Sequence, residues 1–274
     1  MVRAMKSACI PLLLGALALP SLAAAAEGAW GTGTKADVRL IAAAAGADGV
    51  IPAGIEIALP PGWHTYWRSP GDAGIAPVFD FSGSTNLASA EVSFPVPERL
   101  DDGVSVSNVY EDTVVLPVAV TAADPAQPVD LVVRADLGVC DDICVPDTAS
   151  ASLTVQPGER DEAAAATLAA AEARVPGAAE EGVFVVTSAE RAGGSDKRPV
   201  FRVEAVVPDP AATEIFVEGP DDWAPYTPEA VAGSPGTWTV KFSRRGAHSP
   251  IEGASLRLTL VSGGRAIDQT IPID

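Results

Sequence analysis

Short apolar segments recur along the first half of the chain and constrain its fold more than any other feature. Each is a run of apolar or alternating residues bounded by Gly, Pro, Asp or Ser, which is typical of β-strands. A parallel α/β sheet needs helices between its strands, and no helix pattern is readable here. The pattern therefore predicts an antiparallel β-sandwich. The predicted strands lie at 36–44, 54–60, 63–68, 77–81, 90–95, 113–120, 129–137 and 151–155.

The pattern changes after Pro157-Gly158. Residues 159–177 predict a helix, because acids occupy its first turn, Ala fills its middle and Pro176-Gly177 stops it. Strand signals return beyond Glu181 and predict a second, smaller all-β domain, with hairpin turns at Gly193-Gly194 and Gly263-Gly264. We expect four parts: a signal peptide at 1–26, a sandwich at 27–157, a helical linker at 158–177 and a second β domain at 178–274.

The opening of the chain has the layout of a secretory signal peptide. Arg3 and Lys6 precede an apolar run from Ala8 to about Leu22, and small residues follow. No later segment approaches the roughly 20 apolar residues of a spanning helix. We therefore expect an exported, soluble protein with no stable membrane insertion.

The charge of the mature chain argues against polyanionic partners. Loss of Arg3 and Lys6 lowers the 18 basic residues to 16, against 36 acidic residues, a net charge of −20. Such a chain is repelled by nucleic acid and by anionic lipid. We predict neither as a partner.

Two cysteines, Cys140 and Cys144, carry the strongest chemical signal. Disulfides persist in exported proteins, so these two cysteines are expected to pair with each other. The loop between them is short, so the bond restricts the unfolded chain less than a long-range crosslink would. A short, exposed disulfide is the kind that exchanges readily. From these residues alone, a redox pair and a structural staple are about equally favoured, and a copper(I) site is a third reading.

Acidic residues flank the cysteines. We place Asp141, Asp142 and Asp147 around the pair, where their charge raises thiol pKa values and disfavours thiolates. The pair should therefore wait for a partner's thiolate rather than act as a strongly activated nucleophile.

The aromatic residues of the chain have a more ordinary interpretation. We expect Trp63, Trp67, Trp223, Tyr226 and Trp238 to be core or sheet-face residues. Residues 220–228 are a candidate binding loop, although a turn with an anchored aromatic residue is the commoner structure for such a segment.

Three stretches, at 61–77, 98–120 and 135–153, together resemble the N-terminal periplasmic domain of the thiol:disulfide interchange protein DsbD and of its copper-tolerance relative ScsB. The resemblance covers about 30–155. It implies an all-β chain that begins with an immunoglobulin-like sandwich carrying a redox cysteine pair. It also implies a periplasmic location, thioredoxin-like partners and a separate membrane electron donor.

The resemblance assigns roles to individual residues. Cys144 matches the cysteine that forms the mixed disulfide with the partner, and Cys140 the one that resolves it. His64 and Tyr66 occupy positions beside the family's pair; for each, packing in a half-buried strand is the alternative. The segment 101–105 matches the cap loop but lacks the aromatic tip of the best-known members. Its near-site residues here are Asp102, Gly103 and Val104.

We therefore predict a periplasmic thiol-disulfide exchange module that passes electrons through Cys140 and Cys144 to thioredoxin-like partners, with no cofactor and no bound metal. If active, it is a protein-disulfide reductase-like enzyme. The alternatives are a non-catalytic binding module with a structural disulfide and a copper-handling protein.

Overall fold

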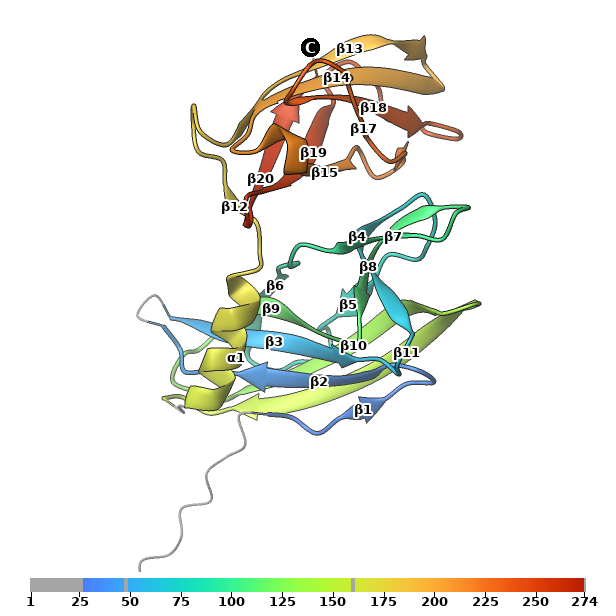
Figure 1. The fold of residues 1–274 in the computed structure, drawn as a ribbon. Helices are drawn as coiled ribbons and strands as arrows, with labels where there is room; N and C mark the ends of the chain where they lie inside the picture. The colour runs from blue at the N-terminus through green and yellow to red at the C-terminus, as the bar shows by residue number, and fades with distance from the viewer. Residues whose placement is uncertain (1–26, 47–48, 159–160, 274) are drawn as a thin grey trace, which may run out of the picture.

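Two β-sandwiches joined by a helix make up the described part of the chain (Figure 1). The computed structural model describes residues 27–46, 49–158 and 161–273. The predicted signal peptide at 1–26 lies outside the described residues. Every strand predicted from the sequence overlaps an observed strand, so the predicted all-β class is confirmed.

The first sandwich consists of two antiparallel sheets and has the predicted immunoglobulin-like fold. One sheet has the order β1 (Gly31–Thr32), β2 (Asp37–Ala42), β3 (Val50–Ala58), β9 (Thr113–Ala122) and β6 (Leu87–Val92). The other has the order β11 (Cys144–Val155), β10 (Val129–Cys140), β4 (His64–Gly71), β8 (Val106–Glu111) and β7 (Glu98–Asp101), with β5 (Val78–Asp80) paired to β10.

Alternation along these strands builds the first core. Leu131, Val133 and Ala135 on β10 point inward and are fully buried, while the residues between them are more exposed. Facing residues on β3 and β9 complete a mainly aliphatic core. Each fully buried Val, Leu or Ile in this core contributes roughly 1.5–3 kcal/mol to the stability of the sandwich.

The helix α1 (Glu162–Glu172) begins after Asp161, whose side chain accepts a hydrogen bond from the Ala164 amide. It lies within the predicted range, of which 159 and 160 are outside the described residues. The helix does more than connect. Leu168 packs against Ile41 on the outer face of the first sandwich, and Gly54 leaves the space that Leu168 fills.

The second sandwich repeats the two-sheet arrangement in a smaller form. One sheet has the order β12 (Gly177–Ala178), β20 (Arg265–Pro272), β19 (Ser255–Ser262) and β15 (Glu214–Glu218), in which β12 runs parallel to β20. The other has the order β13 (Val185–Ser195), β14 (Arg198–Val206), β18 (Thr237–Ser243) and β16 (Ala224–Pro225), with β17 (Glu229–Ala230) paired to β18. A short 3₁₀ turn (Pro210–Ala212) precedes β15.

Two local predictions for the second half were wrong, the turn at Gly193-Gly194 and the core position of Tyr226, while the turn at Gly263-Gly264 was right. Gly193-Gly194 is not the hairpin turn; it lies inside β13 beside a register shift, and the turn falls at residues 196–197. Glycine there serves a bulge, where the backbone φ is positive. Gly263-Gly264 is the predicted two-residue turn, with both φ values positive. Tyr226 is 43% exposed and is not a core residue, whereas Trp223 in the same loop is buried.

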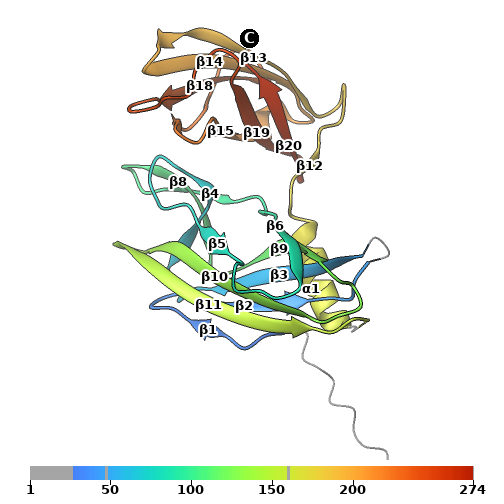
Figure 2. The same cartoon turned by 180° about the vertical axis from the view of Figure 1, so that it is seen from behind.

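The two sandwiches contact each other. Figures 1 and 2, which show opposite sides, both place the second sandwich beside the end of the first that carries β4, β7 and β8. Within the part of the chain that the structure describes, no helix has the length and apolar character needed to cross a membrane.

Candidate redox site

The disulfide Cys140–Cys144 closes the tip of the long β10–β11 hairpin. The two cysteines are directly paired across the hairpin, with Cα atoms 4.1 Å apart. The strands extend further than predicted, because the ladder continues through Gly138 and Pro146 up to the cysteines themselves. The bond therefore sits at the end of a rigid ribbon, with only Asp141, Asp142 and Ile143 beyond it.

The two sulfur-bearing residues differ in exposure. Cys140 is 1% exposed, because β4 covers it on the side away from β11. Cys144 is exposed, on the hairpin's free edge. Ile143 beside it is 66% exposed, so apolar surface adjoins the accessible cysteine. A reagent or partner from solvent thus reaches Cys144 before Cys140.

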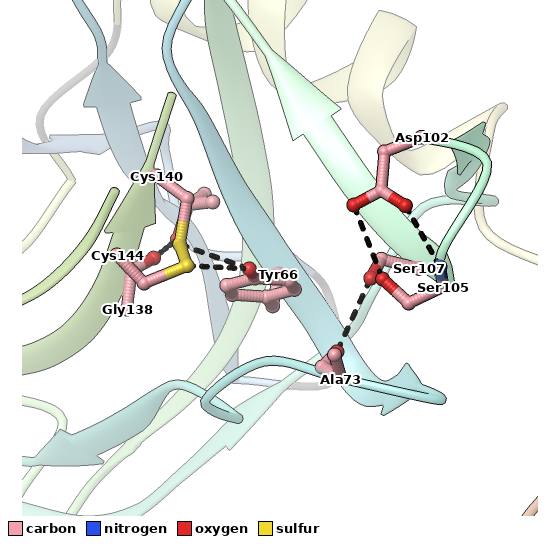
Figure 3. Close-up of a disulfide and its surroundings, with 9 residues drawn as sticks. Tyr66, Ala73, Asp102, Ser105, Ser107, Gly138, Cys140 and Cys144 are labelled. Atoms are coloured by element: carbon pink, nitrogen blue, oxygen red, sulfur yellow. Dashed lines mark hydrogen bonds between the residues drawn. A yellow bond between two sulfur atoms is a disulfide. The ribbon is translucent and has the colours of Figure 1, made fainter. Parts of the chain in front are cut away.

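Tyr66 is the side chain in direct contact with both sulfurs (Figure 3). Its hydroxyl oxygen lies 2.9 Å from Sγ of Cys140 and 3.3 Å from Sγ of Cys144. The disulfide sulfurs carry no proton, so the tyrosine donates. Burial, followed by the charge of Asp102, raises the pKa of Tyr66 and keeps the hydroxyl protonated at neutral pH. A thiolate accepts such a hydrogen bond more strongly than a disulfide sulfur does, so the contact favours the reduced pair.

Two glycines hold the tyrosine ring in place. A Cβ atom added at Gly74 would lie 2.3 Å from the Tyr66 ring, and one added at Gly138 would lie 3.2 Å from it. The loop that carries Gly74 is tied to β8, because the Ser107 hydroxyl donates to the carbonyl of Ala73 (Figure 3). The sequence analysis did not identify these glycines, since nothing in the sequence marks a glycine as the wall of a tyrosine pocket.

His64 lies at the start of β4, paired in the sheet with Cys140 on one side and Glu111 on the other. Its ring meets that of Tyr66 edge-on, with centroids 5.5 Å apart. Burial lowers the pKa of His64, while the charges of Glu111 and Asp141 oppose that change. The structure therefore brings the predicted His64 to the site, in contact with the tyrosine.

The predicted cap loop joins β7 to β8 and is folded on itself. The Asp102 carboxylate accepts hydrogen bonds from the amides of Val104 and Ser105, which lower the pKa of Asp102, and the Asp101 carboxylate accepts one from Gly103. Val104 at its tip is 95% exposed. The charge of Asp102 in this loop also raises the pKa of Tyr66, after the larger effect of burial.

Asp147 does not surround the pair as predicted. It lies three residues beyond Cys144 on β11 and therefore points to the opposite face. The carboxylate is buried and accepts hydrogen bonds from the amides of residues 34, 35 and 36 and of Thr148. Burial raises its pKa, but these four amides outweigh burial and the net pKa is lowered. Of the three aspartates, Asp141 and Asp142 lie at the hairpin tip between the two cysteines.

A metal centre built from several ligands has no counterpart here. Among the described residues, no group of three or more His, Cys, Asp or Glu side chains is arranged to hold a metal ion. The chemistry available at this site is that of two sulfurs, a tyrosine and a histidine.

These features define a class of protein: an immunoglobulin-like sandwich with a disulfide at a hairpin tip, one sulfur accessible and a tyrosine bonded to both. Residues 36–156 match the family model described as "Thiol:disulfide interchange protein DsbD, N-terminal". The predicted resemblance of the first sandwich to the N-terminal domain of DsbD is therefore confirmed.

The whole described fold also has a counterpart among solved structures. The N-terminal periplasmic domain of ScsB from Proteus mirabilis superposes with a TM-score of 0.70 and 22% sequence identity, covering 91% of this chain and 98% of that one. The likeness therefore includes the second sandwich as well as the first. No curated protein sequence matches the chain.

Proposed function

We propose that the chain is a periplasmic thiol-disulfide exchange module that carries electrons to thioredoxin-like proteins, with the sandwich at 27–157 as the exchange domain. The observation that carries the proposal is the pairing of an exposed Cys144 with a buried Cys140 under one tyrosine hydroxyl. The periplasmic location is supported by the family match and by the periplasmic domain that the chain resembles.

The reductive step begins from the dithiol. The Cys144 thiolate attacks the disulfide of the partner, forming a Cys144–partner disulfide and releasing the partner's other sulfur as a thiolate. The Cys140 thiolate then attacks Sγ of Cys144, which restores the Cys140–Cys144 disulfide and frees the reduced partner. Two electrons pass to the partner, and the two thiol protons go to solvent or to the partner's thiolates.

The module is recharged by the reverse chemistry. A thiolate of a separate membrane donor attacks the exposed Cys144, and Cys140 leaves as a thiolate. The donor's second thiolate then attacks the mixed disulfide, which forms the donor's own disulfide and releases Cys144 as a thiolate. The hydroxyl of Tyr66 lies 2.9 Å from that leaving sulfur and stabilises its charge. A hydrogen bond to a charged group is worth roughly 1.5–3 kcal/mol. That contribution offsets part of the cost of holding a buried thiolate at Cys140 beside acidic residues.

The test is exchange of the reduced chain with an oxidised thioredoxin-fold protein, followed by the reduction potential in glutathione buffers. We expect transfer of electrons from the dithiol to the partner's disulfide and a potential above about −300 mV, the range below which structural disulfides usually lie. No exchange together with a lower potential would assign the bond to stabilisation alone. Titration of the reduced protein with copper(I), against a competing chelator, separates the copper-handling alternative.

A further inference from the structure

The second sandwich reaches into the core of the first through Phe216 on β15. This side chain is 1% exposed and belongs to the core cluster of the first sandwich. Its ring centroid lies 5.5 Å from that of Trp67 on β4, and the guanidinium of Arg99 on β7 lies 4.7 Å above it. Arg99 also donates a hydrogen bond of 2.8 Å to the carbonyl of Ile215. One strand of the second sandwich thus touches β4 and β7 together.

An ion cluster at the same contact fixes Arg68. The guanidinium donates to both carboxylate oxygens of Glu218, at 2.8–3.2 Å, and to Asp268 at 3.1 Å. The three side chains are 12–18% exposed, so water screens them little. The planar fork of arginine suits this two-oxygen contact, which lysine cannot reproduce. We refer to Arg68, Glu218 and Asp268 as the interdomain clamp.

The clamp acts on the stretch of β4 that its own sheet holds least. Tyr66 is the last β4 residue in regular register with β8, and the next paired residue is Gly71. Pairing of β4 with β10 ends even earlier, at Thr65. Residues 67–70, all within the described chain, therefore have no ladder partner, and their position depends on Trp67, the clamp and one side-chain bond from Asn108 to Ser69.

Tyr66 and Arg68 are two residues apart on β4, with only the buried Trp67 between them. A shift of the β4 backbone at Arg68 is therefore passed to Tyr66 through one intervening residue, and the tyrosine ring fits its glycine pocket tightly. We propose that the second sandwich, through the interdomain clamp, positions Tyr66 against the Cys140–Cys144 pair, so that Arg68 is a positioning residue for thiol-disulfide exchange.

This inference rests on the proposed function for its purpose, but its measurement does not need a protein partner. The equilibrium of the full chain with reduced and oxidised glutathione gives a constant for reduction of the disulfide. Tyr66→Phe should lower that constant roughly tenfold, the value of one hydrogen bond to a charged sulfur. Arg68→Gln should lower it about threefold, as coupled positions in a packed network typically do.

The decisive comparison is the double variant. If Arg68 acts through Tyr66, the two effects are not additive, and Arg68→Gln changes the constant less than about twofold in the Tyr66→Phe background. An equal effect in both backgrounds, or none in the wild-type background, overturns the proposal. Arg202→Gln is the matched control, because Arg202 on β14 forms a solvent-exposed ion pair with Glu204, and it should leave the constant unchanged. Glu218→Gln replaces Arg68→Gln if that variant does not fold.

Failure of this test is distinct from failure of the proposed function. If the glutathione equilibria follow the prediction but the chain does not react with a thioredoxin-fold protein, the role of the interdomain clamp is supported and the proposed exchange function is overturned. If the chain exchanges with that protein but the effects of Arg68→Gln and Tyr66→Phe are additive, the exchange function is supported and the role of the clamp is overturned.

Discussion

The two sandwiches share a two-sheet architecture but differ in the residues of their cores and in the reactive groups at their ends. The first has a mainly aliphatic core and places a disulfide, a tyrosine and a histidine at one end. The second has an aromatic cluster in which Phe242 contacts both Phe201 and Trp223, and it has no cysteine. The layered fold alone therefore gives no chemistry. Chemistry arises where a hairpin tip meets the tyrosine of a neighbouring strand.

The contact between the sandwiches adds a second lesson. The aromatic residue Phe216 belongs to the second sandwich by sequence and to the core of the first by packing. The second sandwich, which has no cysteine, thus contacts the strand of the first that bears Tyr66. We expect changes in the second sandwich to affect mainly stability, and changes around Tyr66 to affect the disulfide as well.

Truncation of a side chain in the aromatic core of the second sandwich should cause the largest loss of stability. Phe242→Ala removes a fully buried ring that contacts two others, and it should destabilise the protein by about 3–5 kcal/mol. Chemical denaturation followed by tryptophan fluorescence measures this, since Trp223 lies in the cluster. A cost below about 1 kcal/mol would mean that the cluster does not stabilise the second sandwich.

The glycine wall of the tyrosine pocket should be the most sensitive position near the disulfide. Gly74→Ala places a methyl group inside the Tyr66 ring at a positive φ, and should cost about 3 kcal/mol through strain and overpacking. Gly103→Ala is the matched control, since Gly103 also has a positive φ but open space around it. Its cost should be confined to about 1–2 kcal/mol of backbone strain. Equal costs for the two variants would contradict the packing role of Gly74.

Asp147 should link stability to acid in the first sandwich without touching its redox site. Its native pKa is lowered, so its contribution is complete above the unfolded value of about 3.9 and is lost as pH falls through the native pKa. Asp147→Asn should cost about 2 kcal/mol at pH 7. Urea unfolding between pH 7 and pH 2.5 should show that cost shrink below pH 4, while the glutathione equilibrium stays the same. A variant that changed that equilibrium would place Asp147 at the site after all.

The smallest effect concerns His64. Its native pKa lies below the unfolded value of about 6.5, because burial disfavours the charged ring. Stability should therefore fall slightly as pH drops from 6.5 through the native pKa, since the unfolded chain binds the proton more readily. The ring is partly exposed, so we expect less than about 1 kcal/mol. His64→Phe should abolish this slope between pH 7 and pH 5, and an unchanged slope would assign it to another group.

Sequence reasoning reached the strands and the cysteine pair because both are local signals. Alternation predicted β10 up to Leu137. Gly138 and the aspartates interrupt the apolar pattern, so the pairing that continues to the cysteines was not predicted. Counting by twos from Cys144 would have shown that Asp147 faces away from the pair. The bulge at Gly193-Gly194 and the exposure of Tyr226 depend on packing that a single sequence does not encode locally.

The contacts that complete the site were beyond the reach of the sequence. Gly74 and Gly138 come from separate segments, and only the fold brings both to the ring of Tyr66. The insertion of Phe216 beside Trp67 joins positions about 150 residues apart by a contact between two sandwiches. Such long-range contacts follow from shape and not from any pattern within one segment.

The central claim is that Cys144 is the sulfur that partners attack and Cys140 the one that resolves the product. The most direct measurement is trapping of a covalent complex with a thioredoxin-fold protein whose own resolving cysteine is replaced, using Cys140→Ser and Cys144→Ser as a matched pair. Cys140→Ser should accumulate a mixed disulfide through Cys144, identified by mass spectrometry, and Cys144→Ser should form almost none. Equal trapping by both variants, or trapping through Cys140 alone, would contradict the account.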